Sequence, residues 1–212
     1  MRLGYWIRQS LKMTMIILAG SAAYTVMMAV QGTVDGIMEA LEMGGMFLMM
    51  FGAMISTVLN TTVYQLHIPL TLSFGSTRKE AFAGIQLYRL INGLIVVLGG
   101  CGLYGFAGAL GDEGLMPAWC FGVLGMGGYL LMGAFGILMG ILSNKLGKVA
   151  LGVMSAVVSL LGMVAIGGAV LGLELGFGLE RWMVWIVLAL GAVVYGLMLI
   201  PEVRTLKKFC VR

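Results

Sequence analysis

The side chains best suited to a specific local chemistry gather in one polar segment, residues 69–84, which reads PLTLSFGSTRKEAFAG. Thr77 and Glu80 have the spacing of a capping box. In that motif the threonine hydroxyl accepts a hydrogen bond from the amide of the glutamate, and the glutamate carboxylate accepts one from the amide of the threonine. Gly75, two residues earlier, permits a sharp turn. The pattern therefore predicts a fixed turn followed by a helix that starts near Thr77 and continues to about Leu110.

Apolar and basic residues flank this predicted turn. Leu70, Leu72 and Phe74 precede it, and Arg78 and Lys79 follow it. An apolar patch beside basic side chains is typical of a surface that contacts another protein. An ordinary basic loop next to a membrane would contain similar residues, and the residues alone leave both interpretations open.

The rest of the chain carries no catalytic or metal-binding pattern. It has no HExxH and no Gly-x-Ser-x-Gly motif, and its three cysteines lack the spacing of metal ligands. A phosphate-binding loop is also missing, since Val149 follows Gly147-Lys148 where that loop needs Ser or Thr. We therefore expect neither an enzyme nor a resident cofactor or metal, so any ATP and magnesium would bind a partner.

The elements that must position the polar segment follow from the composition. The 212 residues are 60% hydrophobic and 10% charged, against about a quarter charged in soluble domains. This favours a membrane protein whose single domain spans residues 1–212. Six apolar stretches approach or exceed the roughly 20 residues of a membrane-spanning helix. They lie near 13–30, 43–64, 87–110, 118–142, 149–173 and 182–200. Because open strands cannot span lipid, the expected fold is an all-α bundle of six transmembrane helices.

The basic residues indicate how this bundle sits. Of the 13 Lys and Arg residues, all but Arg181 fall on one predicted side of the membrane. Lys and Arg stay in the cytoplasm during insertion, so both termini are expected there, in a multi-pass protein of the plasma membrane. The external loops are then short, and the largest cytoplasmic feature is the segment 65–86.

The amino terminus has an amphipathic pattern of its own. Residues 1–12 place Trp6 on an apolar side and Arg8 and Lys12 on a basic side. This predicts a separate helix lying in the lipid headgroup region. Its role is either topological anchoring or docking of a partner.

Residues 69–82 resemble a known motif. The pattern Pro-Leu-x-Leu-Ser-Phe-Gly-x-Thr-Arg-Lys-Glu-x-Phe is similar to the coupling segment of bacterial ABC (ATP-binding-cassette) transporter permeases of the type-2 exporter class. The resemblance implies a permease that works with a cytoplasmic ATPase subunit and a second permease chain. The short external loop 174–181 departs from the longer hairpin of many family members. The implied ATPase-docking residues are Leu70, Leu72, Phe74, Gly75, Thr77, Arg78, Lys79, Glu80 and Phe82.

Glycine is the other compositional excess, with 34 residues. Gly136 and Gly140 have GxxxG spacing, and Gly128 lies nearby. Glycines of this kind let transmembrane helices pack closely. Both tight packing within one bundle and a moving interface agree with the pattern.

Two other classes of function are consistent with six spans. One is a small channel or a secondary carrier that needs no ATPase, and the other is a non-transporting assembly or immunity protein. The predicted spans contain no Asp, Glu or His and only one basic residue, Arg89, which argues against a proton-coupled carrier. Nothing in the sequence points to nucleic acid.

Overall fold

A computed structural model of the chain describes residues 2–30, 36–109, 117–146 and 181–208. These residues are helical, with no strand among them. The long helices are α1 (Arg2–Val30), α2 (Ile37–Thr62), α4 (Arg78–Ala109), α5 (Ala118–Leu146) and α7 (Arg181–Lys208). Five helices are long and apolar enough to cross a membrane. The predicted all-helical class is therefore confirmed for the described residues, and the predicted span 149–173 lies outside them.

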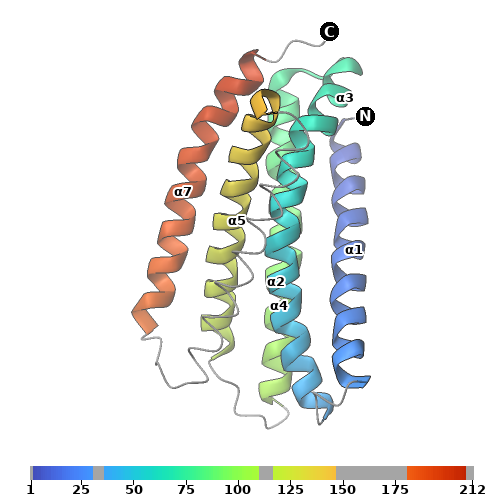
Figure 1. Cartoon of the computed structure of the whole chain (residues 1–212), viewed down its shortest axis with the longest axis vertical. Coiled ribbons are helices and arrows are strands. Elements are labelled where there is room, and N and C mark those ends of the chain that lie inside the picture. Colours follow the sequence, from blue (N-terminus) through green and yellow to red (C-terminus); the bar gives the residue numbers. More distant parts are fainter. Residues whose placement is uncertain (1, 31–35, 110–116, 147–180, 209–212) are drawn as a thin grey trace.

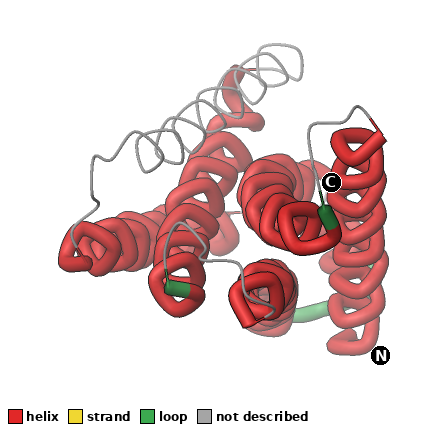
Figure 2. Tube along the Cα trace, turned by 90° about the horizontal axis from the view of Figure 1, so that it is seen from below, coloured by secondary structure: helices red, strands yellow, loops and turns green. Residues whose placement is uncertain are grey.

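The long helices lie side by side in one bundle (Figure 1). Helix α2 packs against α1, α4 and α5, and α7 packs along α5. Figure 2 views the bundle from below, with α1 and α7 on opposite sides of it. The two ends of the described chain and the short helix α3 (Ile68–Ser73) lie together at one end of the bundle, here called the α3 end.

Helix α2 does not stop where the predicted span ends. A π-helical turn, η1 (Val63–His67), continues it directly into α3. The sequence predicted that Pro69 would start a separate segment, whereas it lies in the first turn of α3. Because η1 runs into α3 without a break, Pro69 lies inside a continuous helical run, where its missing amide hydrogen removes one backbone hydrogen bond. The helical run therefore extends beyond the predicted span and places the turn at residues 74–77.

The predicted separation of an interfacial helix 1–12 from a span 13–30 is not seen. Helix α1 is one continuous element. Ile7 and Leu11 are exposed on its surface. The buried face follows packing against α2 and α4 and is formed by Trp6, Ser10, Thr14, Ile17 and Ser21. Small polar residues allow this close approach, and Arg8 and Lys12 lie on the exposed face.

Helix α7 also runs further than predicted. The last span was predicted to end at residue 200, but the helix contains Pro201 and continues to Lys208. The hydroxyl of Thr205 donates to the Pro201 carbonyl oxygen at 2.8 Å, in the region where proline disrupts the regular ladder of backbone bonds. The extension brings Glu202 into the helix, where its side chain is fully buried.

The three glycines named from the sequence differ in their surroundings. A Cβ atom on Gly136 would lie 2.6 Å from Asn60 Cβ and 2.7 Å from the Thr57 carbonyl oxygen, so α5 and α2 nearly touch there. Gly140 lies against the ring of Tyr64. A Cβ on Gly128 would meet nothing within 4 Å, so Gly128 makes no such contact within the described chain.

Candidate functional site

The turn between α3 and α4 is closed by backbone hydrogen bonds at the end of α3. The amide of Ser76 donates to the Thr71 carbonyl at 3.1 Å, and the amide of Gly75 donates to the Leu72 carbonyl at 3.0 Å. This pair of bonds forms a Schellman motif, which needs a left-handed residue after the helix. Gly75 fills that position with φ of 77°, a conformation that costs residues with a Cβ about 1–2 kcal/mol.

The start of α4 contains both hydrogen bonds of the predicted capping box. The Thr77 amide donates to Glu80 Oε2 at 2.8 Å, and the Glu80 amide donates to Thr77 Oγ1 at 3.3 Å. Only Ser76 and Thr77 separate Gly75 from the first residue of α4, Arg78. The turn is therefore short and held on both sides by local bonds.

The apolar residues before the turn divide between the surface and the core. Leu70 is 43% exposed and Phe74 is 75% exposed, whereas Leu72 packs against the core together with Phe82. Leu66 in the π-helical turn was not among the predicted docking residues, and it is 63% exposed. Leu66, Leu70 and Phe74 are spaced four residues apart, and we call this set the exposed apolar line.

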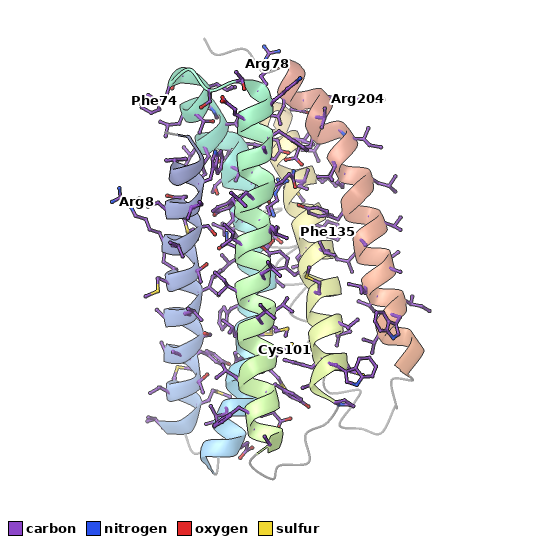
Figure 3. The ribbon with its side chains drawn as sticks, turned by 180° about the vertical axis from the view of Figure 1, so that it is seen from behind. Arg8, Phe74, Arg78, Cys101, Phe135 and Arg204 are labelled. Atoms are coloured by element: carbon purple, nitrogen blue, oxygen red, sulfur yellow. The ribbon has the colours of Figure 1, made fainter. Side chains whose placement is uncertain are left out.

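Basic side chains lie near this line. Arg78 and Lys79 are exposed at the first turn of α4. Figure 3 shows that Phe74 points away from the bundle at the α3 end, and that Arg8, Arg78 and Arg204 extend outward from three different helices at that end. The α3 end thus combines exposed apolar anchors with positive charge.

Trp6 lies beneath the turn. Its ring is buried beside Gly84 of α4, and its centroid lies 6.1 Å from that of Tyr88 and 5.9 Å from that of His67. The neighbouring Tyr5 hydroxyl lies 2.7 Å from His67 Nδ1. These contacts attach α1 to the π-helical turn and to α4, so His67, expected in a loop, takes part in helix packing.

A second polar site lies deeper, where α2, α4 and α7 meet. Arg89 Nη1 donates to both carboxylate oxygens of Glu202 at 2.8 Å, and Arg89 Nε donates to Asn60 Oδ1. Gln86 Nε2 donates to Glu202 Oε2 at 3.2 Å, and the Tyr195 hydroxyl donates to Gln86 Oε1 at 3.1 Å. We call these five residues the polar cluster.

The polar cluster is buried almost completely at its charged centre. Arg89 is 4% exposed and Glu202 is 0% exposed. Burying the two charges costs several kcal/mol for each ion, which only close pairing and further hydrogen bonds repay. Two atoms next to this centre remain without a hydrogen-bond partner, Arg89 Nη2 and the Tyr64 hydroxyl. Tyr64 lies close enough to interact with the charges of both Arg89 and Glu202.

Sequence reasoning missed this pair because it placed Glu202 beyond the end of the last span. Glu202 lies two residues beyond the predicted span 182–200, in the helix that continues it, and its carboxylate is buried inside the bundle beside Arg89. Arg89 alone was a usable signal, because a charged side chain at membrane depth needs a partner.

Comparisons of the chain with protein-family models, with curated protein sequences and with solved structures found no match.

Proposed function

We propose that this chain is the membrane-spanning permease subunit of an ATP-driven exporter of the ABC class, and that the α3–α4 turn docks a separate ATPase subunit. The observation that carries the proposal is the exposed apolar line beside Arg78 and Lys79, on a turn that local hydrogen bonds hold in shape. The proposal also draws on the resemblance of residues 69–82 to the coupling segment of those permeases.

The length of α4 supports a position of the turn outside the lipid hydrocarbon. Its 32 residues extend over about 48 Å at 1.5 Å per residue. The hydrocarbon core is about 30 Å thick, so several turns of α4 project beyond it. In this proposal the end beside Phe74 is the one that projects, where lipid tails would not cover Phe74 and a protein partner would be its natural cover.

In this proposal the α3 end faces the cytoplasm of a bacterial cell, six helices cross the plasma membrane, and a second permease chain completes the pathway. The last turn of α5 and the first turn of α7 lie at opposite ends of the bundle (Figure 1). A span over 149–173 would join those two points. ATP and magnesium would bind the ATPase, since this chain carries no phosphate-binding loop.

The proposal is tested by purifying the tagged chain from its own membranes in mild detergent. We expect a stoichiometric, ATP-hydrolysing subunit to co-purify, and we expect the double substitution Leu70→Ala/Phe74→Ala to release it. Phe106→Ala is the matched control, because Phe106 is also exposed on α4 but lies far from the turn. A chain that purifies without any ATP-hydrolysing subunit would contradict the proposal.

The polar cluster favours a second candidate, a secondary carrier. Charged residues at membrane depth commonly mark ion or proton pathways, and Arg89 and Glu202 lie within candidate spans. Purified chain in sealed vesicles tests this candidate: ion or proton flux without ATP supports the carrier, and the absence of such flux contradicts it.

A further inference from the structure

Helix α7 is attached to the bundle by a close backbone contact, by polar side chains and by apolar residues, among them Leu206 in the core. In its first half it lies against α5, where a Cβ on Gly191 would be 2.7 Å from the Gly127 carbonyl oxygen. The ring of Trp119 on α5 also stacks on that of Trp185 on α7, with centroids 6.2 Å apart. The backbones of the two helices therefore meet closely at Gly127 and Gly191.

In its second half, α7 reaches α4 through polar side chains. Glu202 accepts hydrogen bonds from Arg89 and Gln86, and Tyr195 donates to Gln86. Gly191 and Glu202 are 11 residues apart in the sequence, or about 16 Å along the helix. The close backbone contact and the polar contact are thus well separated along α7.

We propose that the Arg89–Glu202 pair is a latch that holds the second half of α7 against α4, and that α7 swings about the Gly127–Gly191 contact when the latch opens. This inference does not depend on an ATPase partner. It applies equally to a permease and to a carrier.

The unused hydrogen-bonding groups supply a second arrangement for the opened state. A separated Arg89 keeps Asn60 and can turn Nη2, which has no hydrogen-bond partner, toward the Tyr64 hydroxyl, which already lies near both charges. A separated Glu202 keeps Gln86 as a donor if that side chain follows it. Two alternative sets of partners for the same buried groups are what a two-state element requires.

The local backbone also favours movement at the latch. Pro201, directly before Glu202, lies inside α7, and a proline within a helix removes one backbone hydrogen bond and weakens the helix there. Tyr64 lies in the π-helical turn η1, and single π-helical turns inside longer helices often occur at functional sites. Pro201 and the π-helical turn therefore both lie beside the ion pair.

The test measures two distances between α4 and α7 with spin labels, in lipid nanodiscs and with the three native cysteines replaced by alanine. One pair of labels is placed at the exposed positions Ala83 and Arg204, near the latch. The other is placed at the exposed positions Leu98 and Leu190, near the Gly127–Gly191 contact.

We expect a main short distance and a minor longer one between positions 83 and 204. Glu202→Gln and Arg89→Gln should each convert most of the short population to the longer one. The exchanged pair Arg89→Glu/Glu202→Arg should restore the short distance. The distance between positions 98 and 190 should stay unchanged in every variant, which shows that the bundle remains folded.

Several results would overturn the latch. One is an unchanged distance between positions 83 and 204 in both single variants, and another is an equal change in both distances. A third is no recovery of the distance between positions 83 and 204 in the exchanged pair while the distance between positions 98 and 190 is unchanged. A starting protein with only the short population would also overturn it, because the ion pair would then be a permanent connection.

Discussion

Arg89 on α4 and Glu202 on α7 lie 113 positions apart in the sequence, yet the Arg89 guanidinium lies 2.8 Å from the Glu202 carboxylate inside the bundle. Each charge would be isolated in a low-dielectric interior without the other. The pair therefore makes the position of α7 depend on that of α4. Removal of one partner should lower the free energy of unfolding.

Arg89→Met should lower the free energy of unfolding by about 3–5 kcal/mol, because Glu202 is left buried without its counter-charge. Arg89→Met/Glu202→Met should lose much less, since replacement of both partners of a buried pair by apolar residues is often nearly neutral. Thermal unfolding in one detergent, followed by circular dichroism, compares the variants. Equal losses in the single and double variants would show that the charges themselves contribute little.

Gly136→Ala should destabilise the protein by about 1–3 kcal/mol, because its methyl group would overlap the α2 backbone at Thr57. Gly128→Ala is the matched control on the same helix. It has open space around its Cβ position and should change stability by less than about 0.5 kcal/mol. The same unfolding assay checks both, and a larger loss at Gly128 would place an unseen neighbour, such as a second chain, at that position.

Thr77→Ala should loosen the first turn of α4 without removing the exposed apolar line. A lost N-cap costs about 1 kcal/mol, which corresponds to roughly fivefold faster hydrogen exchange where local opening controls exchange. Glu80→Gln should have a smaller effect, because glutamine can also complete a capping box. Hydrogen exchange measured over residues 78–82 tests this, and unchanged exchange in Thr77→Ala would show that the cap does not hold the turn.

Much of the helical framework followed from local patterns. The capping box, the turn at Gly75 and the boundaries near Ala109 and Ala118 depend on residues close in sequence, so the sequence was sufficient to predict them. The buried face of α1 could not be predicted in this way. Trp6 is buried because Gly84, distant in sequence, leaves space for its ring.

The extension of α7 also depended on distant residues. Taken alone, Pro201 and the charged residues after it indicate the end of a span. Arg89 stabilises the continued helix by providing a buried partner for Glu202. Only the three-dimensional arrangement brings the pair together, although the need of Arg89 for a partner was visible from its predicted depth.

Phe74→Ala should weaken binding of the proposed ATPase by about 2 kcal/mol, the usual effect of removing a central apolar anchor. That loss corresponds to roughly 30-fold in the dissociation constant. Leu72→Ala is not a suitable control, because Leu72 packs against the core, whereas Phe106→Ala removes another exposed ring elsewhere. Titration of the isolated ATPase onto the chain in nanodiscs gives both affinities, and equal affinities would exclude Phe74 from the contact.

The most direct test of the proposed docking is a photo-cross-linker placed at position 74 in living cells. We expect one dominant cross-linked product, a cytoplasmic protein that binds ATP, and we expect that the same cross-linker at position 106 does not capture this protein. Cross-linking at position 74 only to lipid, or to no ATP-binding protein, would contradict the central claim that the α3–α4 turn couples this chain to an ATPase.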